Sequence, residues 1–143
     1  MLISTKGRYA LRVMIDLAEH QTDGYIPLKE VAQRQDISEK YLETIIRLLV
    51  KANILSGLRG KGGGYKLTKS PDQYTVGAIL RLTEDSLAPV SCLGPGAAVC
   101  ARVAECRTLH MWQGLDKVIN EYLDNVTIAD LMKSGAAGDN YVI

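Results

Sequence analysis

Long apolar runs are absent from this chain of 143 residues. No stretch approaches the roughly 20 apolar residues that a membrane-spanning helix needs. The opening, MLISTKGRYA, has charged residues where a secretory signal would have an apolar core. We therefore expect a cytoplasmic protein. Its 47% hydrophobic content is enough to bury the core of one ordinary domain with an accessory element.

Histidine is nearly absent, with His20 and His110 the only two in the chain. No Ser/His/Asp arrangement and no pair of carboxylates stands out, so the sequence predicts that the protein is not an enzyme. The glycine-rich stretch RGKGGG lacks the glycine spacing ahead of Gly-Lys-Ser/Thr that a phosphate loop requires. Nucleotide binding is therefore not expected.

Cysteine is absent except in the segment from Cys92 to Cys106, which holds all three. An odd number of thiols in a reducing cytosol argues against a disulfide framework. Cys92, Cys100, Cys106 and His110 make four candidate metal ligands, with seven, five and three residues between them. Sulfur-rich sites of this kind select zinc or iron–sulfur clusters.

The spacing favours a cluster over zinc. Structural zinc more often takes close Cys-x-x-Cys pairs, whereas a two-iron cluster spreads its ligands over two metals. We predict an iron–sulfur cluster, with 2Fe-2S favoured over 4Fe-4S. Glu105, an acidic residue of a partner subunit or an exogenous ligand could replace His110 as the fourth ligand. The alternative to metal binding is that the thiols are small buried hydrophobic groups.

Charge is unevenly distributed along the chain, although the net charge is only +1. Residues 1–70 carry twelve Lys and Arg against seven Asp and Glu, or +5, and residues 71–143 carry five against nine, or −4. A basic half is a modest indication of nucleic-acid binding, because neutralising phosphates supplies most of the non-specific affinity.

Helical periodicity dominates the basic half. Apolar residues recur at helical spacing from Thr5 to Glu19, with Asp16 among the polar residues off that stripe. A second, short helix can start on Pro27, because a first helical position leaves an amide unpaired in any case. Ser38 is a good N-cap for a third helix. The expected buried face of that helix is Leu42, Ile45, Ile46 and Leu49.

A glycine turn follows the helices. ILSGLRGKGGGYKL is typical of two strands around a tight turn, since glycine tolerates positive φ angles. Three helices and a hairpin predict a winged helix-turn-helix, so the fold class is mainly α with a small β wing. Thr75 caps a further helix, VGAILRLTED, which precedes the cysteines.

A longer helix is expected from about Arg107 to Asn125, and a last short one from Thr127. The long helix carries apolar residues at alternating steps of three and four, the pattern of a seam that joins two chains into a homodimer. The seam is Trp112, Leu115, Ile119, Tyr122 and Val126.

These elements predict four segments. Residues 1–74 form the winged helix-turn-helix domain, and residues 75–106 form a connecting helix with the cysteine loop. Residues 107–132 form the dimerisation helix and the terminal helix, and residues 133–143 form a tail.

The third helix of a helix-turn-helix enters the major groove with its first turns facing base edges. This geometry nominates Ser38, Lys40, Tyr41, Glu43 and Thr44 as contacts to double-stranded DNA. Glutamate can accept a hydrogen bond from a cytosine amino group, so Glu43 is a candidate specificity residue. The wing tip carries Arg59 and Lys61 on a turn slim enough for a minor groove.

The segments ISTKGRYALRVMIDLA, ISEKYLETIIRLLVKANILSGLRGKGGGYKL and VGAILRLTED resemble the Rrf2 family of bacterial winged-helix regulators. The resemblance covers roughly residues 1–132. It is strongest to the iron–sulfur regulators of the IscR type, while the tail GDNYVI resembles the CymR type. Relative to the IscR-like pattern, the first gap between cysteines is two residues longer and His110 lies one position further on.

The resemblance implies a homodimer formed through the long C-terminal helix, and a cluster on Cys92, Cys100 and Cys106. It implies a repressor that senses cluster status and controls cluster-assembly genes, in which Glu43 takes part in operator choice. The alternatives are a CymR-like regulator of cysteine metabolism, with a protein partner on the tail, or a thiol-redox or nitric-oxide sensor. The remaining expected DNA contacts are Ser4, Lys6, Arg8, Tyr9, Leu28, Arg47, Gly60 and Gly62.

Overall fold

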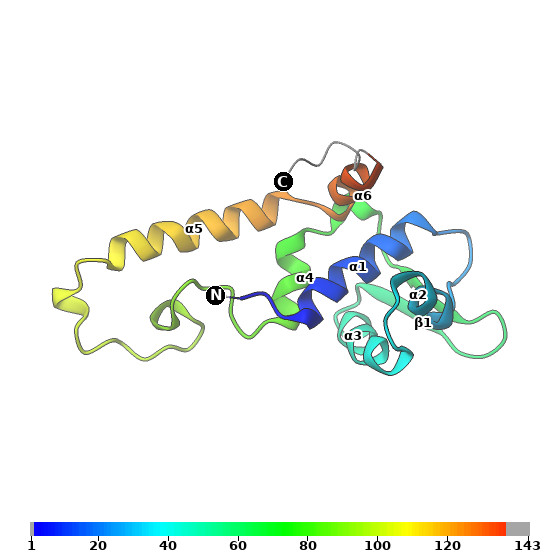
Figure 1. Cartoon of the computed structure of the whole chain (residues 1–143), viewed down its shortest axis with the longest axis horizontal. Helices are drawn as coiled ribbons and strands as arrows, with labels where there is room; N and C mark the ends of the chain where they lie inside the picture. Colours follow the sequence, from blue (N-terminus) through cyan, green and yellow to red (C-terminus); the bar gives the residue numbers. More distant parts are fainter. Residues whose placement is uncertain (1, 137–143) are drawn as a thin grey trace.

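The computed structural model describes residues 2–136, with the side chains of 134–136 left aside. Residues 133–136 of the predicted tail belong to the last helix, and the rest of that tail, including the predicted partner site, lies outside the described residues. Figure 1 shows a globular body from which one long arm extends. The elements are α1 (Thr5–Glu19), α2 (Leu28–Gln35), α3 (Glu39–Lys51), β1 (Leu55–Leu58), β2 (Gly64–Leu67), η1 (Pro71–Gln73), α4 (Val76–Thr83), η2 (Ser91–Leu93), η3 (Val103–Glu105), α5 (Leu109–Asn125) and α6 (Ile128–Ala136).

Hydroxyl side chains start four of these helices. The Oγ atoms of Ser4 and Ser38 and the Oγ1 atom of Thr75 each accept a hydrogen bond from the amide three residues on. At α6, Thr127 and Asp130 exchange hydrogen bonds between side chain and amide in both directions. These contacts satisfy amides that have no partner within the helix, so the helix starts are set by local sequence.

Four expected helix boundaries were wrong by one or two residues, one of them the start of the last helix, which is Ile128 and not Thr127. Pro27 is the N-cap of α2 and not its first residue, because its ψ of 140° is extended. α4 ends at Thr83, since the backbone of Glu84 is extended at φ −102° and ψ 140°. α5 starts at Leu109, because a short 3-10 turn, η3, occupies the chain just before it.

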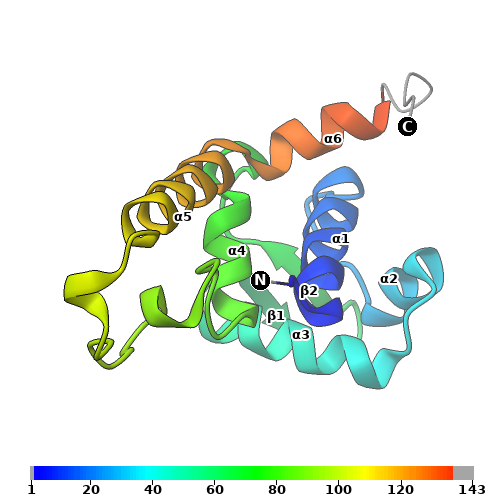
Figure 2. The same ribbon diagram turned by 60° about the vertical axis from the view of Figure 1, so that its left-hand side comes forward.

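The main core lies among α1, α2, α3 and the hairpin. The predicted buried face of α3 is confirmed, with all four residues buried. α4 and α6 pack on α1, and Ile128 of α6 is fully buried in the same core. Figure 2 shows α1 and α4 above α3, with α6 leaving the far end of α5. The last helix thus shares a core with the first.

Asp16 was expected on the polar face of α1 but is buried, with an exposed fraction of 2%. Arg34 of α2 donates hydrogen bonds to both of its carboxylate oxygens, the shortest at 2.8 Å, and the Gln35 amide donates another at 2.9 Å. A buried carboxylate needs such partners to offset lost hydration. The cluster fixes the end of α2 against α1.

The wing is an antiparallel hairpin in which Leu55 pairs with Leu67 and Leu58 with Gly64. At the tip, two glycines have φ of +90° and +77°, which confirms the predicted role of glycine there. Gly64 has a φ of +148°, and a Cβ on it would lie 2.1 Å from the Ile26 carbonyl oxygen. Glycine at this position therefore lets the next residue of β2 pair with Ile26 and tie the wing to the segment before α2.

α5 differs from the other long helices because none of its residues is buried. It forms the arm seen in Figure 1, together with the loop that carries the cysteines. Within residues 2–136, no helix combines the length and apolar character needed to cross a membrane.

Candidate nucleic-acid interface and cysteine loop

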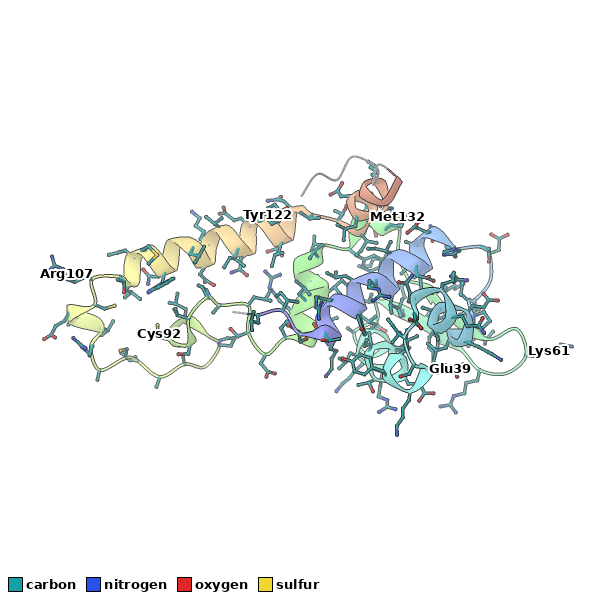
Figure 3. All side chains as sticks on the ribbon, in the orientation of Figure 1. Glu39, Lys61, Cys92, Arg107, Tyr122 and Met132 are labelled. Atoms are coloured by element: carbon teal, nitrogen blue, oxygen red, sulfur yellow. The ribbon has the colours of Figure 1, made fainter. Side chains whose placement is uncertain are left out.

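The outer face of α3 is polar and open to solvent. Lys40, Glu43, Thr44 and Arg47 are exposed, as helical spacing predicted. Ser38 is exposed too, although its Oγ accepts a hydrogen bond from the backbone amide three residues on, at 3.2 Å. Figure 3 shows Glu39 at the start of this helix on the lower face of the body. The side chains of the face lie free to meet an external partner.

A groove of about 700 Å³ separates α3 from the wing. Glu43 and Arg47 line it from α3, and Arg59 lines it from the wing. The structure therefore brings together the candidate specificity residue and two cations. Lys61, Gly60 and Gly62 lie beyond the groove at the exposed wing tip, which Figure 3 labels at Lys61.

The start of α1 supplies a second polar surface. Ser4 and Arg8 are exposed, and Lys6 is half-buried. The guanidinium of Arg8 donates to the Thr5 hydroxyl at 3.1 Å. The Ser4 hydroxyl already donates to Glu84, so Lys6 and Arg8 are the side chains here that remain available to a phosphate.

Three of the expected DNA contacts also have packing roles. Tyr9 and Tyr41 are half-buried and pack edge to face, with ring centroids 5.7 Å apart. Leu28 is half-buried against the main core. These residues join α1, α2 and α3, so they position the surface whether or not they touch DNA.

The cysteine loop connects α4 to α5. Cys92 lies in η2, Cys100 lies in the open segment that follows, and Cys106 caps the end of η3. All three thiols are free and exposed, so burial as small hydrophobic groups does not explain them. His110 is exposed in the first turn of α5. Figure 3 shows Cys92 in this loop, far from Lys61 at the wing tip.

Backbone hydrogen bonds hold the loop only to itself. From 91 to 106 each of these bonds joins residues three apart, such as Gly94 to Ser91. At the end of the loop, hydrogen bonds from the Thr108 hydroxyl and amide lower the pKa of the Cys106 thiol, helped by the following amide and the charge of Arg102. Lowering this pKa favours the thiolate, the form that binds metal or reacts with oxidants.

The donor set fits a sulfur-ligated cluster in its chemistry, since three thiols stand on one loop and one of them is biased toward thiolate. In the conformation that the structure describes, no three His, Cys, Asp or Glu side chains of residues 2–136 converge on a point where one metal could bind. Because only local hydrogen bonds shape the loop, it can change conformation without breaking the core.

One side of α5 faces the body of the molecule. Val126, the last residue of the predicted seam, packs on a small apolar cluster that includes Val76 and Leu80 of α4. Trp112 and Ile119, also from that seam, are half-buried. Part of the predicted seam is therefore covered within a single chain.

A second side of α5 carries an exposed apolar stripe, which the predicted seam only partly anticipated. Leu115 and Tyr122 belong to both the stripe and the predicted seam, whereas Met111 and Val118 each lie one position before a seam residue. The stripe consists of Met111, Leu115, Val118 and Tyr122.

α4 is bound at both sides through polar side chains that sequence reasoning missed. The Arg81 guanidinium donates to Asp124 at 2.6 Å and to Asn120 at 2.7 Å, which fixes α5 on α4. Glu84 accepts hydrogen bonds from Ser4 at the start of α1. No local pattern could reveal these pairs, because 39 to 80 residues separate the partners.

Residues 3–134 match the model of the Rrf2 family, described as iron-dependent transcriptional regulators. The chain is similar to the HTH-type transcriptional regulator IscR of Photobacterium profundum, at 36% identity over 93% of this chain and 76% of that protein. It is similarly related to IscR of Sodalis glossinidius, at 37% identity over 94% and 80%.

Solved structures show the same fold. The global cysteine regulator CymR of B. subtilis is 36% identical, with a TM-score of 0.74 over 93% of this chain and 97% of that one. IscR of T. potens is 36% identical, with a TM-score of 0.73 over 100% and 93%. The oxidized form of Staphylococcus aureus CymR is 30% identical, with a TM-score of 0.70 over 100% and 99%.

Proposed function

The chain belongs to the Rrf2 family, whose members are DNA-binding transcriptional regulators and not enzymes, and on this premise we propose that it is a repressor that senses iron–sulfur cluster status. The cluster would be held by Cys92, Cys100 and Cys106. The genes it controls would include those for cluster assembly.

One observation carries the proposal: the three cysteines are free and exposed on one loop whose hydrogen bonds are all local. A loop of Gly, Ala and Pro that leaves three thiols in solvent has no packing purpose. Thiolates are the ligands that iron–sulfur centres use, and the irregular spacing suits 2Fe-2S better than 4Fe-4S. A bound centre would supply a state that changes with iron supply or oxidation.

In this proposal His110 is the fourth ligand. His110 is exposed one turn beyond Cys106, at the start of α5. An imidazole there would join the loop to the arm. Glu105 or an acidic side chain of a second subunit is the substitute if His110 is not required.

The regulator would act as a homodimer through the exposed stripe of α5. Four large apolar side chains at steps of four, three and four are costly to leave in water, and a second copy of the stripe would cover them. A dimer would present two copies of α3 and the wing, which suits a two-fold symmetric operator. Each copy of α3 would then read one half-site through Glu43 and its neighbours.

The decisive experiment is purification without oxygen, followed by visible and EPR spectra and quantification of iron and sulfide. We expect a brown protein with iron and sulfide in equal amounts, bleached by serine at Cys92, Cys100 or Cys106. The matched control adds Ser86→Cys to the Cys92→Ser variant, so that the chain again has three thiols but one of them lies at a different position. This double variant should stay bleached. A colourless protein after anaerobic reconstitution would overturn the proposal.

A second candidate function is thiol sensing, in which oxidation of cysteine changes DNA affinity. The observation that favours it is the lowered pKa of the exposed Cys106 thiol. The similarity to the global cysteine regulator CymR and to an oxidized CymR structure supports regulation of cysteine metabolism. Iron-free protein whose operator affinity changes with peroxide, and no longer does so in Cys106→Ser, would favour this candidate.

A further inference from the structure

Glu84 joins two parts of the molecule that the proposed function uses separately. Its Oε1 accepts a hydrogen bond from the Ser4 amide at 2.5 Å, and its Oε2 accepts one from the Ser4 hydroxyl at 2.6 Å. Thr83 donates a third bond to Oε2 at 3.0 Å. In Figure 1 the dark blue start of α1 lies beside the end of α4, where this contact forms.

The space for the carboxylate comes from Gly7. A Cβ at position 7 would lie 3.0 Å from the Glu84 Oε2 atom and 3.0 Å from the Thr83 Oγ1 atom. The Ser4 hydroxyl also accepts a hydrogen bond from the Gly7 amide at 3.0 Å, as the N-cap of α1. One hydroxyl therefore serves both the helix start and the Glu84 carboxylate.

The carboxylate is kept ionised in this place. Partial burial opposes its charge, but the Ser4 hydroxyl and amide, the Thr83 hydroxyl and the charge of Lys6 outweigh burial, so the pKa of Glu84 lies below its ordinary value. An anion at the first turn of a helix also interacts favourably with the unpaired amides there. The contact is thus built to hold a negative charge.

The Glu84 contact fixes the end of α1 that carries the expected phosphate contacts. Ser4 is the N-cap, and Lys6 and Arg8 follow within the first turn. Phosphate contacts set the register of a protein on its duplex, so a small displacement of this turn would misplace them. A negative charge next to DNA is otherwise unfavourable, so a carboxylate beside the expected phosphate contacts points to a structural role for Glu84.

Glu84 also marks the point where the chain leaves α4 for the cysteine loop. Cys92 is eight residues further on. Leu87, between them, is buried in the small apolar cluster on α4, and Ile3 packs on the same cluster. Residues 3 and 4 are therefore both held near the end of α4, Ile3 by the apolar cluster that includes Leu87 and Ser4 by Glu84.

We propose that Glu84 is a positioning residue for DNA binding: by holding Ser4 it orients the first turn of α1 toward phosphate, and it transmits the conformation of the 85–106 loop to that turn. The transmission rests on the proposed cluster function, whereas the positioning does not.

The positioning is tested in a full-length chain whose three cysteines are serine, so that no cluster can form. Operator affinity is measured for this background and with Glu84→Gln added. We expect about eight- to tenfold weaker binding near 0.1 M salt, the effect of losing about one phosphate contact. The slope of log affinity against log salt should fall by about 1, as in Lys6→Ala.

The matched control is Asp85→Asn, which removes the same charge one residue away. Asp85 is exposed and forms no hydrogen bond or ion pair with the residues that the structure describes. Simple electrostatics predicts that removing either charge leaves affinity equal or higher, so only a positioning role lowers it for Glu84→Gln alone. Equal behaviour of the two variants, with both folded by circular dichroism, would overturn the positioning.

The transmission is tested with wild-type cysteines, by comparing cluster-loaded and cluster-free protein on the operator. In Glu84→Gln we expect the ratio of the two affinities to fall toward 1, and in Asp85→Asn to stay at the wild-type value. A wild-type ratio in Glu84→Gln would overturn the transmission. If the wild type takes up no iron and sulfide, the proposed function fails instead, while the cluster-free measurement still decides the positioning.

Discussion

The body of the molecule and its arm, formed by α5 and the cysteine loop, differ in how far their residues are buried. In the body, α1 and α3 bury continuous apolar faces, with Ala10, Val13, Leu42 and Leu49 at 0% exposure. In the arm, α5 buries no residue and the cysteine loop is hydrogen-bonded through its backbone only to itself. The comparison teaches that this chain stabilises α1 and α3 by burial within one copy, whereas no residue of α5 is buried within one copy.

Truncating the body should have the largest effect. Leu49→Ala removes a fully buried side chain between α3 and its neighbours. We expect the free energy of unfolding to fall by about 3 kcal/mol, measured by denaturant titration. Val99→Ala, in the exposed loop, is the control and should change it by less than about 0.5 kcal/mol. A similar loss in the free energy of unfolding for both variants would contradict the proposed difference in stabilisation between body and arm.

Charging the arm should act on assembly rather than on folding. Leu115→Asp places a carboxylate in the exposed stripe of α5. If the stripe joins two copies, we expect the dimer to weaken by at least about tenfold, because burying an unpaired charge is unfavourable. Analytical ultracentrifugation measures the change. Lys117→Asp, on the same helix outside the stripe, should leave the dimer unchanged, and equal weakening in both variants would contradict the proposed interface.

Within the body, a substitution on the wing side of the groove and one on the α3 side should change DNA binding in different ways. Arg59→Ala should weaken binding to every sequence by about tenfold and lower the salt slope by about 1. Glu43→Ala should instead reduce discrimination between cognate and altered operators, with a change of about 1–3 kcal/mol. Binding isotherms at several salt concentrations separate the two. Unchanged discrimination in Glu43→Ala would contradict its role in reading bases.

The smallest expected effect is a pH dependence at the junction of body and arm. Because the pKa of Glu84 is lower in the folded chain, its contribution to stability is present above its unfolded value of 4.5 and is lost as pH falls through the folded value. Glu84→Gln should therefore lose less stability than the wild type on acidification to about pH 3. Thermal unfolding across this range measures it, and parallel curves would show that Glu84 is not linked to folding.

Local features of the fold were predictable from local sequence. The bounds of α1, the caps at Ser38 and Thr75 and the buried face of α3 were all expected, because hydroxyl caps and apolar periodicity act over a few residues. The glycine wing was expected for the same reason. Family resemblance and the comparisons then agree on a winged-helix regulator.

Contacts across the chain were not predictable. Asp16 looked like a surface residue of α1, since only the tertiary structure brings Arg34 to its buried carboxylate. The exposed stripe of α5 coincides only partly with the predicted seam, because packing against α4 decides which side of that helix is left open. Pairs this far apart have no signature in composition or spacing.

The sequence by itself determined the hydroxyl caps of α3 and α4 and the glycine turn of the wing. It also determined which half of the chain is basic, and that three thiols stand together before the long helix. Those properties follow from neighbouring residues and from simple counts. Only the tertiary structure decided that Ile128 returns to the core of α1, that Glu43 and Arg59 face one groove, and that Glu84 holds Ser4. Burial and hydrogen bonding between distant segments depend on how the helices pack, and packing is a property of the whole chain.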